Sequence, residues 1–200
     1  MPWSTPRTWT TGELATAANM NTYVSDNLSY LYSIVPAMEF GVADILNNSN
    51  VETTFATTTI GAGSLGTTGA LDGVTRVMVT QSSGGAINYT FRVKFGATTI
   101  FAPVLAINSN AGLSVYAIHY RIANMESASA QRCHMWFTFY NYASASQTTQ
   151  NAATGTYHMY NTCAENTAGA LAFAFTGQMA SATATGYIYH LGTELIGPLT

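Results

Sequence analysis

The chain has 200 residues, of which 48% are hydrophobic but only 8% are charged, and its formal net charge is −3. Typical globular proteins carry roughly 25% charged residues, so charge repulsion does little to keep copies of this chain apart, and the composition suits an assembly or an extracellular setting. Six Lys and Arg residues without a basic stripe argue against nucleic-acid binding, which needs cations to displace counterions.

The sequence also gives no sign of a membrane partner or of export. It contains no run of about 18 apolar residues, and the start MPWSTPRTW has no apolar segment of the kind found in signal peptides. The two cysteines, Cys133 and Cys163, could form one bridge, but we expect two reduced thiols because nothing indicates secretion.

Residues 1–12 are predicted to form an extended arm. Pro2, Pro6 and Gly12 break regular structure, while Trp3 and Trp9 supply two large apolar rings. Tryptophan in an extended segment favours an apolar groove on a partner, because each ring removes a large area from water. We therefore expect Trp3 and Trp9 to anchor the chain to a particle.

An amphipathic helix is predicted after the arm. Thr16 can cap its start, and Pro36 ends it. Apolar residues recur at helical spacing, namely Met20, Val24, Leu28, Leu31 and Val35. Two interpretations remain open: the helix packs on its own β domain, or Val24, Leu28, Leu31 and Val35 form the core of a short parallel bundle. The second predicts a homotrimer.

From residue 37 onward the hydrophobic pattern has a period of two, which is typical of half-buried strands. We expect about eight to ten strands with no helix between them. This predicts a mainly β chain in which residues 37–200 form an antiparallel two-sheet sandwich of jelly-roll type, preceded by the appendage of residues 1–36. The apolar sides of the alternating runs are Ile87, Tyr89, Phe91, Val93 and Phe95; Tyr116, Ile118, Tyr120 and Ile122; Cys133, Met135, Phe137 and Phe139; and Leu171, Phe173 and Phe175.

Glycine-containing turns separate these runs. Gly96-Ala97 suits a two-residue hairpin loop. The stretch from Ala62 to Gly66 nearly matches the G-x-S-x-G nucleophile motif, but Ala62 replaces its first glycine and no helix follows. We interpret it as a turn. Residues 143–155 and 180–185 are polar, low-complexity loops.

The sequence contains no arrangement of residues that indicates catalysis or a cofactor site. The four histidines fall on different predicted strands with no two at ligand spacing, although a histidine on a symmetry axis could hold a metal or an anion. Isolated acidic residues do not suggest a glycosidase pair. The residues concerned are His119, His134, His158 and His190, and Glu126, Glu165 and Glu194.

Aromatic residues allow one binding function. Trp136, Tyr140 and Tyr142, with Tyr157 and Tyr160, could form a platform on which sugar rings stack. Most aromatic residues of a sandwich must, however, belong to the core or to subunit interfaces.

Two stretches resemble known proteins. WTTGELATAANMNTYVSDNLSYL resembles the start of many tailed-bacteriophage virion proteins, which share the pattern W-x-x-G-E-x-x-T-A-x-x-x-N-x-x-x-x-D-N-x-x-x-L. The residues that fit are Trp9, Gly12, Glu13, Thr16, Ala17, Asn21, Asp26, Asn27 and Leu31. The segment from Thr53 to Leu71, followed by Arg92, Lys94, Gly96, Thr98 and Thr99, is similar to a phage structural β domain.

The resemblance implies a non-enzymatic, oligomeric virion component, assembled in the host cytoplasm, that contacts copies of itself and capsid or tail proteins. We expect a capsid decoration or head-fibre protein. The alternative is a receptor-binding tail fibre or appendage that recognises host surface glycans. A hydrolase acting on cell-wall sugars is disfavoured by the missing acid pair.

Overall fold

The computed structural model describes residues 8, 10–25, 27, 37–39, 45–47, 49–81, 87–107, 113–142, 155–181 and 186–196. The chain divides into two compact units, Met1–Pro36 and Ala37–Thr200. Each unit is described by itself.

The first unit contains a short helix, α1 (Ala17–Met20), that continues into a π-helical segment, η1 (Asn21–Ser25). Thr16 caps α1 as predicted, because its side chain accepts a hydrogen bond from the Asn19 amide at 3.3 Å while its backbone is extended. The π-helical turns were not predicted. They shift the side chains that follow relative to an α-helical stripe. Beyond Ser25 only Asn27 of the predicted helix is described.

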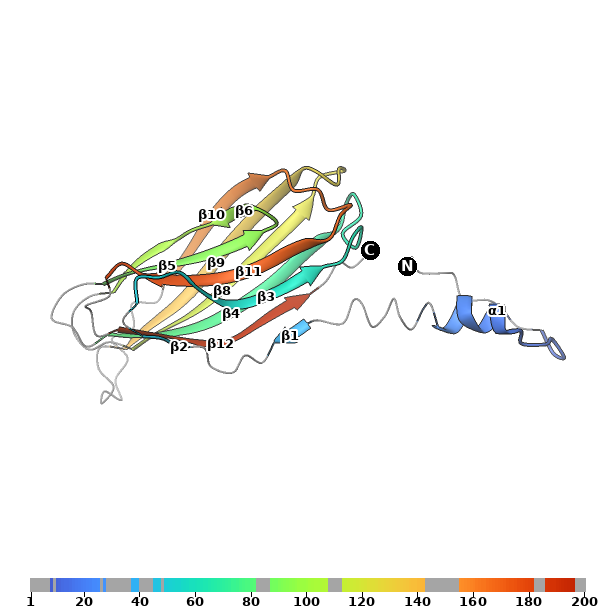
Figure 1. Cartoon of the computed structure of the whole chain (residues 1–200), viewed down its shortest axis with the longest axis horizontal. Coiled ribbons are helices and arrows are strands. Elements are labelled where there is room, and N and C mark those ends of the chain that lie inside the picture. The colour runs from blue at the N-terminus through green and yellow to red at the C-terminus, as the bar shows by residue number, and fades with distance from the viewer. Residues whose placement is uncertain are drawn as a thin grey trace. The chain divides into compact units, whose positions relative to one another are not determined.

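The second unit is the predicted mainly β sandwich of two antiparallel sheets (Figure 1). Its described residues form twelve strands, more than the eight to ten expected, because β1, β2, β6 and β7 have only three or four residues each. The larger sheet has the order β1-β12-β4-β8-β9-β10, with β2 also paired to β12, and the smaller has the order β3-β11-β5-β6, with β7 also paired to β5. The strands are β1 (Ala37–Glu39), β2 (Ile45–Asn47), β3 (Thr53–Ile60), β4 (Ala70–Gln81), β5 (Ile87–Phe95), β6 (Thr98–Phe101), β7 (Val104–Ile107), β8 (Leu113–Asn124), β9 (Gln131–Tyr142), β10 (Gly155–Cys163), β11 (Leu171–Met179) and β12 (Gly186–Ile196).

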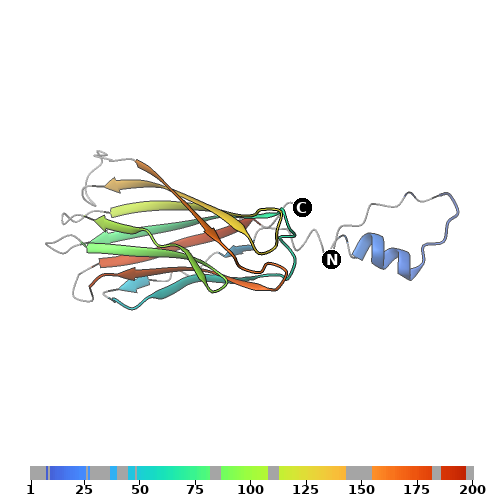
Figure 2. The ribbon, with the colours of Figure 1, turned by 90° about the horizontal axis from the view of Figure 1, so that it is seen from above.

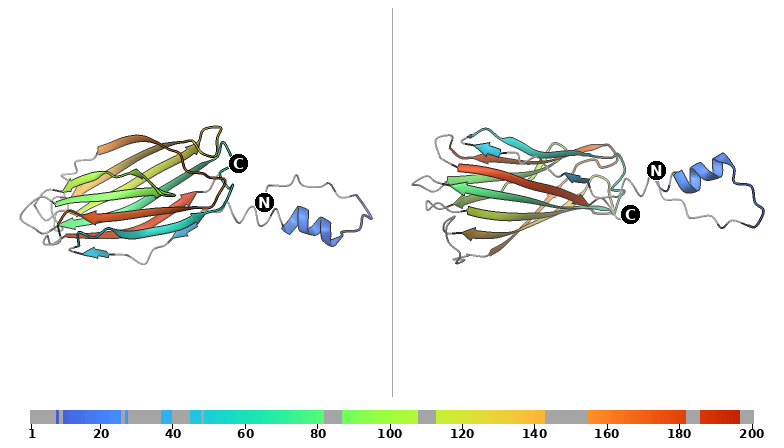
Figure 3. Two further views of the ribbon diagram at one scale, coloured as in Figure 1. Left: turned by 45° about the horizontal axis from the view of Figure 1, so that its top comes forward. Right: turned by 90° about the horizontal axis from the view of Figure 1, so that it is seen from below.

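The chain crosses between the two sheets repeatedly, as in a jelly roll. It passes from β3 in the smaller sheet to β4 in the larger, returns to β5, and crosses again at β7–β8, β10–β11 and β11–β12. Figures 2 and 3 show the resulting layers from other sides. Neighbouring strands of one sheet therefore come from distant parts of the sequence.

The core lies between the sheets and contains most of the predicted apolar faces. Leu171 is only partly buried, and the side chain of Phe139 lies outside the described residues. In β5 every second residue from Ile87 to Phe95 is apolar and buried. The same holds in β8 for every second residue from Tyr116 to Ile122. Successive side chains of a strand point to opposite faces, so the period of two selects the core directly. Stacked aromatic pairs such as Tyr120 on β8 with Phe173 on β11, whose ring centroids lie 5.2 Å apart, join the two sheets.

A chain of polar side chains crosses this core. His190 Nε2 lies 2.8 Å from Thr193 Oγ1, which lies 2.9 Å from Thr75 Oγ1, and Thr75 Oγ1 lies 3.3 Å from the Tyr120 hydroxyl. All four residues are buried. Burial and the adjacent hydroxyl act oppositely on Tyr120, and burial dominates, so its pKa is raised well above the ordinary value. These bonds tie β12, β4 and β8 together.

The predicted hairpin at Gly96-Ala97 joins β5 to β6. Gly96 has a φ of +61°, which suits glycine. The Glu165 carboxylate accepts hydrogen bonds from the Ala97 amide at 3.1 Å and from the Thr98 hydroxyl at 2.6 Å. Glu165 therefore holds a turn, which is a structural task.

Candidate interaction surfaces

The first candidate surface is the N-terminal turn and helix. Gly12 has a φ of +86°. This conformation lets the chain reverse, so that the Thr10 amide donates to the Glu13 carboxylate at 3.2 Å while the Glu13 amide donates to the Thr10 carbonyl. Farther along, the Asn27 side chain is buried and its amide donates to the Tyr23 carbonyl at 3.3 Å. Gly12, Glu13, Thr16 and Asn27 of the virion pattern thus all have local structural roles.

Apolar side chains of this unit face solvent. The exposed fractions are 80% for Leu14, 44% for Met20 and 38% for Val24, and neither α1 nor η1 has a buried residue. Of the residues predicted to mediate oligomerisation, only Val24 is described, and it is exposed. Leu28, Leu31 and Val35, and the predicted anchors Trp3 and Trp9, lie outside the described residues.

The second candidate surface is a ring cluster on the outer face of the larger sheet. It consists of His119 on β8, His134 and Trp136 on β9, and His158 and Tyr160 on β10. His119 lies parallel to Trp136 with ring centroids 5.0 Å apart, and His134 lies parallel to Tyr160 with centroids 4.4 Å apart. Tyr160 is 75% exposed. The cluster ends at β10, which Figure 1 shows at one border of the sheet.

Two of these histidines share a hydrogen bond. His134 Nε2 and His158 Nδ1 lie 3.1 Å apart, so one nitrogen donates and the other accepts, and the pair requires at least one neutral ring. Burial, and secondarily the Arg76 charge, lower the pKa of His119. The His119 imidazole on this outer face is therefore neutral at neutral pH.

The histidines lie on different strands, as the sequence predicts. The register, which the sequence does not show, places three of them on one surface: His119 opposite Trp136, Trp136 opposite His158, and His134 opposite Tyr160. Alternation alone could have shown that they face outward. In the described part of the chain, no group of three or more His, Cys, Asp or Glu residues is arranged to hold a metal ion.

The structure describes only part of the predicted sugar platform. Trp136, Tyr140 and Tyr142 belong to β9, but the side chains of Tyr140 and Tyr142 lie outside the described residues. Trp136 is half-buried and in contact with the rings of His119 and His134. Less of its ring is open to a ligand than an isolated tryptophan would offer. Tyr160 is the more open ring.

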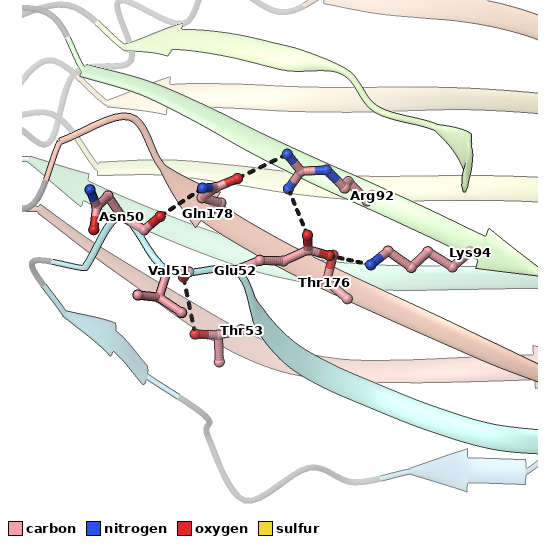
Figure 4. Close-up of polar contacts among 8 residues, drawn as sticks. All are labelled: Asn50, Val51, Glu52, Thr53, Arg92, Lys94, Thr176 and Gln178. Carbon is pink, nitrogen blue, oxygen red and sulfur yellow. Dashed lines mark hydrogen bonds and ion pairs between the residues drawn. The ribbon is translucent and has the colours of Figure 1, made fainter. Parts of the chain in front are cut away.

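The outer face of the smaller sheet carries an ionic cluster around Glu52, just before β3 (Figure 4). Its carboxylate accepts from Lys94 Nζ at 2.6 Å and from the Thr176 hydroxyl at 2.5 Å, and lies 3.5 Å from Arg92 Nη1. The hydrogen bond from Lys94, then the one from Thr176, lower the Glu52 pKa.

The same cluster fixes the segment that enters β3. Arg92 Nη2 donates to Gln178 Oε1 at 2.9 Å, and Gln178 Nε2 donates to the Asn50 carbonyl at 2.6 Å (Figure 4). Because Glu52 is held on three sides, it is placed to clamp this segment and not to act as a free acid or base.

The nucleophile-like stretch is a turn, as predicted. Residues 62–68 form turns, Leu65 is buried, and the Ser64 hydroxyl donates to the Gly61 carbonyl at 2.8 Å. A catalytic serine would instead donate to a base.

Comparison with known proteins adds no family. No protein-family model matches the chain, and no curated protein matches it either. None of the helical segments in the described part of the chain has the length and apolar character needed to cross a membrane.

Solved structures with a similar arrangement are distant. Lectin II from Ulex europaeus has a TM-score of 0.37 and 10% identity, covering 83% of this chain and 96% of the lectin. The CBM2 module of the evolved Dit of Lactobacillus casei BL23 phage J-1 has a TM-score of 0.34 and 11% identity, covering 72% and 69%. The Gt strain structure of infectious bursal disease virus has a TM-score of 0.30 and 14% identity, covering 82% of this chain and 42% of the viral one. At these scores, the likenesses carry no functional argument.

Proposed function

We propose that the chain is a non-enzymatic structural protein of a tailed-bacteriophage virion, an oligomeric capsid decoration or head-fibre protein attached through its N-terminal unit. The observation that carries the proposal is the first unit itself. Residues of the virion pattern cap and close its backbone, while Leu14, Met20 and Val24 are left exposed. A self-capped segment that presents apolar side chains is suited to burial against other subunits.

Identical copies are one way to cover these side chains. Helices related by a symmetry axis bury the same stripe against one another, and a helix this short is marginal alone. We therefore propose a homotrimer held by Val24, Leu28, Leu31 and Val35, with the arm that carries Trp3 and Trp9 bound to the particle. The sparse charge supports this arrangement, because surfaces between subunits are poor in charge.

A substitution experiment tests the role of the first unit. Leu14→Gln, Met20→Gln and Val24→Gln, combined in the full chain, should abolish trimer formation and prevent binding to particles that lack the protein. A matched control changes three exposed apolar residues of the sandwich, namely Val51, Val104 and Ile196, to Gln. The control should stay trimeric and bind. If the N-terminal variant behaves like the control, the proposal is wrong.

Truncation separates the arm from the helix. Removing residues 1–12 should leave the melting temperature of the chain almost unchanged, because no described strand is lost, while binding to depleted particles should fail. A truncated chain that melts much lower would indicate an arm folded back on its own subunit. One that binds normally would rule out anchoring by Trp3 and Trp9.

A second candidate function is recognition of host surface glycans. The observation that favours it is the exposed ring cluster, in which Tyr160 and two imidazoles offer both an apolar face and hydrogen-bonding nitrogens. Binding would be detected by calorimetric titration of the full chain with host cell-wall oligosaccharides. Tyr160→Ala should then weaken it at least ten-fold, while Tyr187→Ala on the same face should not. Absence of binding to any host saccharide removes this candidate.

A further inference from the structure

The border strand β10 differs from the other strands at sheet borders. It has nine residues and pairs with β9 in an unshifted register from Gly155 to Cys163, and no other described strand pairs with it. Tyr157 is 57% exposed, Met159 36% and Tyr160 75%. On its inner side β10 reaches the smaller sheet at Asn161, which donates to the Ile100 carbonyl at 2.6 Å.

Proteins protect free strand borders with short strands, charges, proline or bulges, because an open row of backbone groups can pair with another chain. The other borders follow this rule. β1 and β2 have three residues each, β6 and β7 four, and β3 has a register shift against β11. The sequence of β10, GTYHMYNTC, contains no Asp, Glu, Lys, Arg or Pro. Among the described edge strands, β10 is the long one that has none of these protective features.

The sequence of β10 is also compatible with pairing to itself. An antiparallel pair of identical strands is related by a two-fold axis, and the register that pairs all nine residues places the axis at the middle residue, Met159. In that register His158 lies opposite Tyr160 of the second copy, and Tyr160 lies opposite its His158. The outer faces thus present an imidazole to a phenol ring on both sides of the axis.

We propose that β10 pairs with β10 of a second copy of this chain, antiparallel and centred on Met159, so that the two larger sheets become continuous. Within one chain the His134 and Tyr160 rings already stack at 4.4 Å between centroids, and the second copy would extend this ring cluster across the axis. Met159 and Tyr157 would become buried on the inner side. β10 itself carries no Asp, Glu, Lys or Arg that would oppose the contact. The contact uses residues of β10 and not Val24, Leu28, Leu31 or Val35, and within a virion it would join neighbouring oligomers.

A pair of double variants in the full chain tests both the contact and its register. His158→Lys with Tyr160→Lys would place lysines opposite lysines twice, whereas His158→Glu with Tyr160→Lys would place opposite charges there. Both remove the same intrachain ring contacts, so their melting temperatures should match. Cross-strand charge pairs of opposite sign stabilise a sheet and like charges destabilise it.

Native mass spectrometry and analytical ultracentrifugation give the readout. We expect the assembly formed by the variant with two lysines (Lys/Lys) to have at most half the mass of the wild-type assembly. The variant with one glutamate and one lysine (Glu/Lys) should keep the wild-type mass. Equal masses for wild type and Lys/Lys would overturn the contact. Loss of mass in both variants would overturn the register centred on Met159. Hydrogen exchange should show β10 amides protected in the wild-type assembly and exposed in Lys/Lys.

Discussion

The sulfur atoms of Cys133 and Cys163 lie 3.7 Å apart on the adjacent strands β9 and β10, and both thiols are free. The register pairs Cys133 with Asn161 and Cys163 with Gln131, so the cysteines are diagonal neighbours and not directly opposite. Diagonal neighbours in a sheet are farther apart than the backbone separation that a disulfide prefers. The Cys163 thiol donates to Gln131 Oε1 at 3.3 Å.

We expect both cysteines of the purified chain to be reduced, in keeping with the sequence. The neighbouring Cys163 thiol and burial raise the pKa of Cys133, so little reactive thiolate forms at neutral pH. Alkylation followed by intact-mass measurement should give two adducts after unfolding, and none on Cys133 before it. A mass two hydrogens short, without added oxidant, would contradict the prediction. Cys163→Ser should be tolerated, because a hydroxyl can donate to Gln131.

Thr75→Val should destabilise the sandwich by about 1–3 kcal/mol, because it leaves buried polar neighbours short of a partner. Thr75 Oγ1 contacts both the Tyr120 hydroxyl and Thr193 Oγ1. Urea unfolding would measure the loss. Thr59→Val, at an exposed position of β3, is the control and should change the free energy of unfolding very little. If Thr75→Val leaves the free energy of unfolding unchanged, the buried hydrogen bonds of Thr75 do not contribute to stability. A double-mutant cycle with Tyr120→Phe should be non-additive.

Glu52→Gln should lower stability at neutral pH and change its dependence on pH. The Glu52 pKa is lowered in the folded state, first by the hydrogen bond from Lys94. Its contribution is therefore complete above the unfolded value of 4.5 and disappears as the pH falls through the folded pKa. Unfolding free energies of wild type and variant should converge as the pH falls below 4.5 and through the folded pKa. A gap of constant size down to pH 2 would show that the carboxylate charge is unimportant.

Gly73→Ala should destabilise the chain by about 1–3 kcal/mol through overpacking. A Cβ at this position would collide with the buried Tyr120 ring and lie 2.8 Å from Leu195 Cδ2. Gly61→Ala is the matched control, because its nearest neighbour would be Ser64 Cβ at 4.0 Å. Thermal melting of both variants should separate them clearly. Similar melting temperatures would mean that the core around Tyr120 adapts without cost.

Local patterns in the sequence determined much of the sandwich. The period of two selected the buried faces of β5 and β8, because alternate side chains of a strand point to opposite sides. Thr16 and the Gly96-Ala97 hairpin followed from capping and turn preferences that involve only neighbouring residues. These features depend on interactions within a few positions, so they can be predicted without knowing which strands meet.

Only the tertiary structure decided which distant residues meet. Strand order and register bring His134 to His158 and Lys94 to Glu52, and they leave β10 at a border. The three-residue strands β1 and β2 are too short to show a period, and they exist because β12 offers backbone groups to both. Pairing of distant strands depends on the packing of the whole core, and the same alternating sequences could be paired in several orders. The sequence therefore determined which faces are buried, while the fold determined which surfaces remain open to partners.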